Sequence, residues 1–114
     1  MKYLLIHAVD ETLFDQGPDV GADAAAQLAA WIEEMVGRGV LVHGDRLRPT
    51  GDATTVRVTA GDVVVVDGPF AETKEQITGY DLIDCADLDE AIEIASKHPT
   101  SSHGVIEVRP LWFQ

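Results

Sequence analysis

The chain has 114 residues, of which 46% are hydrophobic, so it is long enough for one hydrophobic core and a single domain. Twenty acidic residues against 8 basic ones give a formal net charge of -12, and this field repels polyphosphates, which excludes nucleic acid as an expected partner. The acidity is either a solvated surface that keeps the protein soluble or a means of recognising a basic partner.

The cysteine and histidine pattern predicts neither a disulfide nor a cofactor. Cys85 is the single cysteine, and no Cys/His pair has the short spacing of a structural zinc site. There is also no glycine-rich phosphate loop, and we therefore predict no cofactor. The single cysteine fits a reducing, cytoplasmic setting. Residues 3–9 are too short for a membrane span and are followed by Asp10 and Glu11, so we expect them to form a first strand and not a signal peptide, and we expect no membrane partner.

The first half of the chain reads as strand, helix, strand. Residues 2–9 are strand-like, and an acidic loop with Gly17 and Pro18 precedes a helix that Asp23 can cap. Residues 40–48 then form a second strand. The expected apolar face of the helix consists of Leu28, Trp31, Ile32 and Met35, and the glycines that end it are Gly37 and Gly39.

A β-hairpin and a compact motif follow. Residues 56–58 and 63–66 are rich in valine and flank Gly61 and Asp62, which is the pattern of a hairpin. The second strand runs into the motif Asp67-Gly68-Pro69-Phe70-Ala71-Glu72-Thr73-Lys74-Glu75. Its first three residues have turn chemistry, and Phe70 is expected to anchor the loop in the protein.

The last third of the sequence predicts a strand, a helix and a second strand. Residues 79–85 form a strand, Asp87 and Glu90 have the spacing of a capping box, and Pro99 ends the helix. The final strand covers residues 105–109. Two helices and a mostly antiparallel sheet indicate an α+β fold with two layers. The expected buried helix face consists of Leu88, Ala91, Ile92 and Ala95, and the expected exposed ion pair of Glu93 and Lys97.

Several blocks in this order resemble the DGPF branch of the YCII-related domain family. They are Thr54-Thr55-Val56-Arg57-Val58, the motif at residues 67–75, Gly79-Tyr80, Asp89-Glu90-Ala91 and Ile106-Glu107-Val108-Arg109-Pro110. The resemblance covers essentially the whole chain. It implies a ferredoxin-like, two-layer α+β sandwich that forms a dimeric α+β barrel, with an activity that is largely unassigned.

Strand alternation predicts the face through which a homodimer forms. Leu4, Ile6 and Ala8 form an apolar set that suits the helix layer, so residues 3, 5 and 7 are expected on the opposite, dimer-forming face. Glu107 and Arg109 are expected to share that face with His7 and to enclose a small polar pocket. Alternatively, Glu107 and Arg109 only pair with each other, with Asp81 or across the dimer.

The candidate site residues are drawn from these strands and from the motif. We predict that Asp67 and His7 transfer protons and that a small anionic ligand is bound by Arg57, Lys74, Glu75 and Arg109. For Lys74 the alternative is a solvated salt bridge with its acidic neighbours, and for Asp67 it is turn formation.

Two classes of function fit these residues. The first is a small-molecule enzyme with acid/base chemistry in a dimer pocket that holds a compact carbonyl or carboxylate compound. The second is a non-catalytic ligand-binding or regulatory module. The family resemblance connects the second class with extracytoplasmic-function sigma factors, because DGPF-like proteins are often encoded beside them.

Overall fold

The computed structural model describes residues 1–12 and 22–114, and the predicted acidic loop at Gly17 and Pro18 lies outside them. No helix in this part of the chain combines the length and the apolar character that a membrane crossing requires. The elements are β1 (Lys2–Val9), α1 (Ala22–Gly37), β2 (Leu41–Arg46), β3 (Thr54–Thr59), β4 (Asp62–Asp67), β5 (Gln76–Asp84), α2 (Leu88–Ser96) and β6 (Val105–Pro110), with short 3₁₀ helices at Thr50–Asp52 and Pro99–Ser102.

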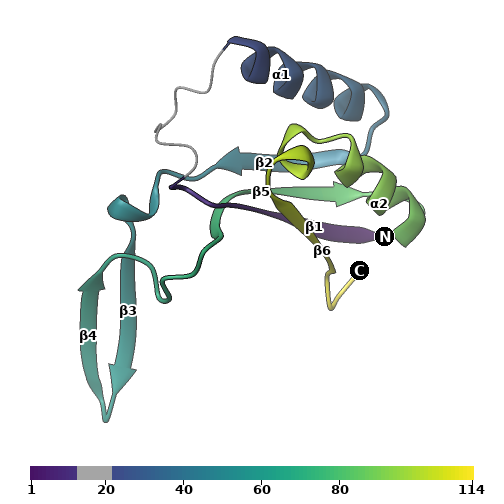
Figure 1. Ribbon diagram of the computed structural model, residues 1–114. Helices are drawn as coiled ribbons and strands as arrows, with labels where there is room; N and C mark the ends of the chain where they lie inside the picture. The colour runs from purple at the N-terminus through teal and green to yellow at the C-terminus, as the bar shows by residue number, and fades with distance from the viewer. Residues whose placement is uncertain (13–21) are drawn as a thin grey trace.

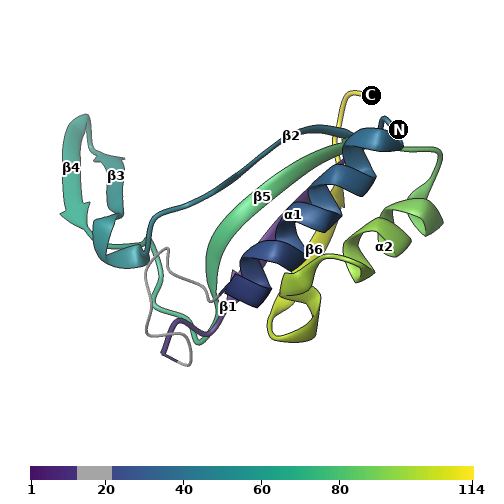
Figure 2. The ribbon, with the colours of Figure 1, turned by 90° about the horizontal axis from the view of Figure 1, so that it is seen from above.

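Four of the strands form an antiparallel sheet in the order β2-β5-β1-β6. Both helices lie on the same face of this sheet, as Figures 1 and 2 show, and no helix of the described residues covers the other face. This confirms the predicted α+β sandwich with two helices, and the strand order is that of a ferredoxin-like fold.

The core lies between this sheet and the two helices. Its fully buried side chains include Leu5, Met35, Ile83 and Ile94. The predicted face of α1 is partly correct, because Trp31 and Met35 are buried while Ile32 is exposed. The predicted face of α2 is wrong at two positions: the helix buries Ala91, Ile94 and Ala95 and leaves Leu88 and Ile92 in solvent.

The predicted orientation of β1 is inverted. Tyr3, Leu5 and His7 are buried under the helices, whereas the apolar set at positions 4, 6 and 8 is only partly buried on the open face. Alternation assigns residues to two faces but does not say which face the helices cover. His7 is tolerated beneath the helices because it has a buried polar partner there. A dimer through Tyr3, Leu5 and His7 is therefore ruled out.

The helix ends follow local chemistry. Asp87 accepts a hydrogen bond from the Glu90 amide at 2.9 Å, and the Glu90 carboxylate accepts one from the Ala86 amide at 2.8 Å. The capping box predicted for α2 is thus present. The helix α1 begins at Ala22, so Asp23 lies in its first turn, where a negative charge is favourable, and does not precede the helix.

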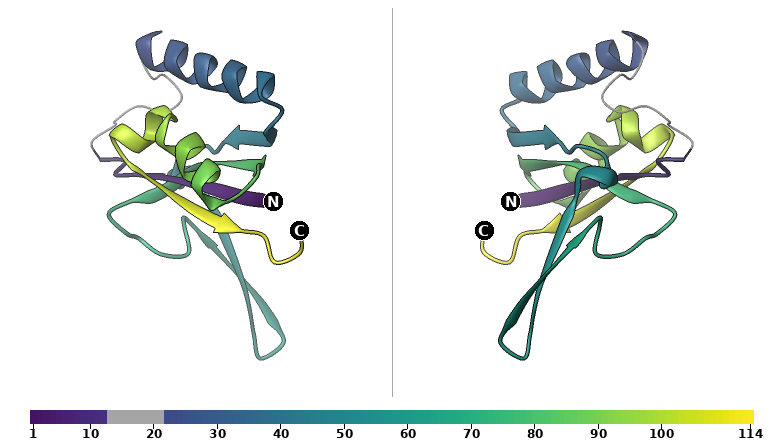
Figure 3. Two further views of the ribbon diagram at one scale, coloured as in Figure 1. Left: turned by 90° about the vertical axis from the view of Figure 1, so that its right-hand side faces the viewer. Right: turned by 90° about the vertical axis from the view of Figure 1, so that its left-hand side faces the viewer.

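The hairpin β3–β4, which we call the arm, is a separate two-stranded sheet that projects from the body of the protein (Figures 1 and 3). Its turn consists of Ala60 at φ 51° and Gly61 at φ 84°, the left-handed conformations that tight hairpins require. The turn lies one position before the predicted pair of Gly61 and Asp62, because Asp62 already pairs with Thr59 as the first residue of β4. Gly68, at φ 98°, continues the predicted turn after β4. The neighbouring Phe70 is 73% exposed, so the prediction that its ring anchors the loop is wrong.

Candidate functional site

Three polar side chains meet in the core beneath the helices: His7, Asp81 and His98. They are exposed by only 4%, 8% and 8%. His7 lies on β1 and Asp81 on β5, where the register pairs His7 with Gly79 and Leu5 with Asp81, so the two polar residues are diagonal neighbours on one face. His98 follows α2 and reaches them from the helix layer.

The three side chains are within contact distance of one another. His7 Nε2 and Asp81 Oδ2 are 2.6 Å apart, which is a short, charge-assisted hydrogen bond when the carboxyl is ionised. His98 Nε2 is 3.8 Å from the same oxygen, and the His7 and His98 rings are in contact, tilted by 35° with centroids 4.2 Å apart. We call this group the histidine–aspartate cluster.

Glycine on the neighbouring strand makes room for the carboxylate. Gly44 of β2 lies opposite Asp81, and a Cβ atom at Gly44 would be 1.9 Å from Asp81 Oδ1. No other residue could occupy that position without moving the carboxylate. Asp81 thus lies between His7 on one side and the Gly44 backbone on the other.

His98 is oriented by the backbone that follows it. The amide of Thr100 donates a hydrogen bond to His98 Nδ1 at 3.0 Å, so the proton of the neutral ring is on Nε2, on the side of Asp81. Burial, followed by repulsion from His7 and His103, lowers the pKa of His98 to about 3. This side chain is therefore a neutral donor near pH 7.

His7 has one nitrogen without a partner. Its Nδ1 atom is buried and makes no hydrogen bond to any residue that the structure describes. If Nε2–H donates to an ionised Asp81, then Nδ1 carries the free lone pair. A carboxylate that orients a histidine in this way leaves the second nitrogen as a base, which is an arrangement used for proton transfer.

The same three residues could be considered as ligands for a metal ion, since one donor atom from each lies within 4.8 Å of the others. Two features oppose this reading. The 2.6 Å separation of His7 and Asp81 is shorter than the roughly 3.3 Å that separates donors at tetrahedral zinc. In addition, the Thr100 amide places the His98 proton on Nε2, the atom that would have to bind the metal. The residues fit a hydrogen-bonded cluster better than a metal centre.

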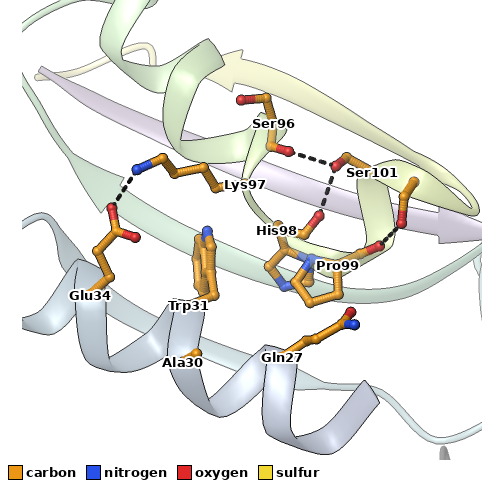
Figure 4. Close-up of a pocket in the computed structure, with 10 residues that line it drawn as sticks. Gln27, Ala30, Trp31, Glu34, Ser96, Lys97, His98, Pro99 and Ser101 are labelled. Atoms are coloured by element: carbon orange, nitrogen blue, oxygen red, sulfur yellow. Dashed lines mark hydrogen bonds and ion pairs between the residues drawn. The ribbon is translucent and has the colours of Figure 1, made fainter. Parts of the chain in front are cut away.

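A pocket of about 520 Å³ lies between α1 and residues 96–102, and His98 forms part of its wall (Figure 4). Trp31 lies edge-on to the His98 ring with centroids 4.6 Å apart, and its Nε1 donates to the Ile94 carbonyl at 3.0 Å. Lys97 pairs with Glu34 at 2.8 Å beside the tryptophan. His98 thus separates the pocket from the buried His7–Asp81 pair.

The structure does not bring the predicted site residues together within one chain. Only His7 lies in the cluster. Arg57 and Asp67 are on the arm, and Glu75 is exposed just before β5. Lys74 lines a second pocket, of about 200 Å³, which contains none of the other predicted site residues.

Arg109 and Glu107 lie on β6, on the open face of the sheet, and pair with each other at 2.7 Å. Their side chains are 66% and 54% exposed. The prediction that they share a face with His7 is wrong, because His7 faces the helices. The alternative of a mutual ion pair agrees with the structure.

Asp81 and His98 were not identified from the sequence as members of this site. For Asp81 a weak signal existed, because it occupies the same strand face as Ile83, where alternation predicts an apolar residue. An acid on this buried face requires a buried partner, and His7 is the polar residue on the same face of the neighbouring strand β1.

The low pKa of His98 predicts that stability depends on pH. The unfolded chain takes up this proton near pH 6.5, whereas the folded protein resists it down to about pH 3. The contribution to stability is therefore complete above pH 6.5 and is lost progressively as the pH falls toward 3. Urea unfolding at a series of pH values should show this slope, and His98→Gln should flatten it. An unchanged slope in His98→Gln would contradict the assignment.

Comparison with known proteins gives a family but no activity. A model of the YCII-related domain matches residues 1–113 of the chain. An uncharacterized protein of Rhizobium meliloti (strain 1021) is 50% identical over 86 residues, which cover 74% of this chain and 69% of the relative.

Proposed function

Because this chain belongs to the YCII-related domain family and its relative has no assigned activity, we propose its function from the site itself: an enzyme that performs acid/base chemistry on a small molecule. The catalytic pair in this proposal is His7 and Asp81. The substrate class is the one proposed from the sequence, a compact carbonyl or carboxylate compound. In this proposal Asp81 has the catalytic role that the sequence analysis predicted for Asp67.

The observation that carries the proposal is the buried His7–Asp81 hydrogen bond of 2.6 Å together with the unpartnered Nδ1 of His7. A buried polar atom without a partner costs free energy, and a protein retains such an atom most readily where it is used. In the proposed role, Asp81 orients the ring and stabilises its charged form while Nδ1 accepts a proton from the substrate.

His98 connects this pair with the pocket. As a neutral ring with its proton directed toward Asp81, it supports the carboxylate without adding a positive charge. The pocket beside it can hold a small molecule between α1 and the segment after α2. Access to His7 then requires a rotation of the His98 ring, which makes His98 a positioning residue.

Deuterium exchange tests the proposal without knowledge of the complete reaction. A panel of small keto acids and aldehydes is incubated with the protein in deuterated water, and loss of the C–H signals next to the carbonyl is followed by proton NMR. We expect exchange of at least one compound to be accelerated and to fall by roughly 10²-fold or more in His7→Gln and Asp81→Asn. The matched control is His43→Gln, a histidine beside Tyr80 outside the cluster. No accelerated exchange across the panel, or full activity in both variants, would contradict the proposal.

A second candidate function is that of a non-catalytic binding module. The deep burial of the histidine–aspartate cluster favours it. His7 is 4% exposed, and its hydrogen bond to Asp81 has the geometry of a purely structural contact as well. A binding module would take up a compound from the panel, detected by calorimetry, without exchanging its protons. The two outcomes distinguish binding from catalysis.

A further inference from the structure

The second pocket, of about 200 Å³, lies where the arm joins the body, among the end of β1, the 3₁₀ helix before β3 and the loop between β4 and β5 (Figure 1). We call it the arm-base pocket, and we propose that it binds a small zwitterion, a molecule with both an ammonium and a carboxylate group, as an amino acid has. Its volume is below the roughly 300 Å³ of pockets for drug-sized ligands, so its ligand is compact. The proposal does not depend on the enzymatic activity proposed for the histidine–aspartate cluster.

Hydrogen bonds hold together the three segments that form the arm-base pocket. The Glu11 carboxylate accepts hydrogen bonds from the Thr50 amide at 3.2 Å and from the Thr50 hydroxyl at 2.6 Å, and so joins the end of β1 to the 3₁₀ helix. Gln76 Nε2 donates to the carbonyl oxygens of Ala71 and Thr73, at 3.1 Å each, and so holds the loop against the start of β5. Because the protein itself orders these walls, a ligand loses less free energy in ordering them.

Two opposite charges line this pocket without neutralising each other. Within the described residues, neither the Lys74 ammonium nor the Glu72 carboxylate forms a hydrogen bond or an ion pair. Glu11 is already engaged in the hydrogen bonds that join the walls. The neighbouring Asp10 accepts a hydrogen bond from the Thr12 hydroxyl at 2.6 Å, which is the main cause of its lowered pKa, and the charge of Lys74 makes only a smaller contribution. A ligand with two opposite charges can therefore pair with both free charges at once.

The neutral polar side chains of the pocket add hydrogen-bond acceptors. Each threonine hydroxyl in the lining already donates a hydrogen bond within the protein, so its lone pairs remain available. Both N–H groups of the Gln76 amide are also engaged, which leaves its oxygen as an acceptor. An ammonium group has three N–H donors and no acceptor, so it fits this set together with the Glu72 carboxylate. The threonines are Thr12, Thr50 and Thr73.

The charge of the whole protein favours a zwitterion over a simple ion. With a formal net charge of -12, the protein repels a small anion as it approaches Lys74. A simple cation would pair with Glu72 and leave Lys74 without a partner. A zwitterion has no net charge, so it avoids the repulsion and pairs with both side chains.

Four small probes separate these ligand classes. L-alanine and its isomer β-alanine have both charged groups at two different separations, propionate has only the carboxylate, and ethylamine has only the ammonium. Each probe is titrated into nitrogen-15-labelled protein at constant ionic strength, and the amide signals of Thr12, Thr73 and Gln76 report on the pocket. We expect saturable shifts with at least one alanine isomer, and binding of propionate and ethylamine that is roughly tenfold or more weaker. No saturable shift with either isomer, equally tight binding of a simple ion, or shifts confined to Ser101 and Ser102 of the other pocket would overturn the proposal.

Variants of the motif locate the two charges that bind the ligand. Lys74→Gln and Glu72→Gln should each weaken binding of the alanine isomer by roughly tenfold or more. The matched control is Glu75→Gln, which removes an acid of the same motif that does not line the pocket. All three side chains are exposed, so the fold should tolerate these changes. Unchanged binding in Lys74→Gln or Glu72→Gln, or equal weakening in Glu75→Gln, would contradict the site. Because the measurement is binding at the arm-base pocket, it stays informative if the protein proves to have no proton-exchange activity.

Discussion

Replacing Asp81 by alanine should lower the free energy of unfolding by about 3 kcal/mol, because the change leaves a buried histidine without its partner. In the native protein the His7–Asp81 hydrogen bond is 2.6 Å long and both side chains are nearly inaccessible to solvent. Removal of one partner does not return the other to water. Urea unfolding at pH 7 measures the loss.

The matched control is Glu107→Ala. It also removes the acid of a short pair, at 2.7 Å from Arg109, but both of these side chains are more than half exposed. Water replaces the lost contact there, so we expect no clear change in stability. The losses of stability caused by Asp81→Ala and His7→Ala should be strongly non-additive in the double variant. The reason is that His7→Ala removes the buried ring that Asp81→Ala leaves without a partner. Additive losses would show that the two residues contribute independently and would contradict their coupling.

Gly44→Ala should have the second large effect, with a loss of about 1–3 kcal/mol or more. A Cβ atom at this position would lie 1.9 Å from Asp81 Oδ1 and 3.0 Å from the Tyr80 carbonyl oxygen, and the backbone atom cannot yield as a flexible side chain can. The carboxylate must therefore move, and its hydrogen bond with His7 must change. Unfolding curves measure the stability, and nitrogen-15 NMR of the His7 ring reports the hydrogen bond.

Gly51→Ala is the control for this substitution. A Cβ atom at Gly51 would meet no other atom within 4 Å, and the residue lies in a short 3₁₀ helix outside the four-stranded sheet. We expect little change in stability and an unchanged His7 signal. If Gly44→Ala behaves in the same way, the proposed close approach of Asp81 to β2 is incorrect.

Much of the local structure could be predicted because its causes are local. The capping box at Asp87 and Glu90 depends on two residues three positions apart, and the turn at Ala60 and Gly61 depends on the conformational freedom of one glycine and the strands beside it. The order of helices and strands then limits the fold to an α+β sandwich. These features need no knowledge of distant contacts.

The candidate site could be predicted only in part. His7 was recognised as a candidate, but its partner lies 74 positions away in the chain, and pairing over such a distance depends on strand order and register. The loop motif at residues 67–75 groups several ionisable residues in the sequence, yet the structure places Asp67 at the base of the arm, paired with Thr54, and leaves Phe70 in solvent. Residues that are close together in the motif are therefore not close to the histidine–aspartate cluster.

The sequence by itself determined which residues of this protein share a strand face or a helix cap, since these depend on the geometry of a few successive residues. Only the tertiary structure decided which face of β1 the helices cover, because an alternation of period two is the same whether read from one face or the other. That choice buries His7 against Asp81 and His98 and leaves Leu4 and Ile6 on the open face.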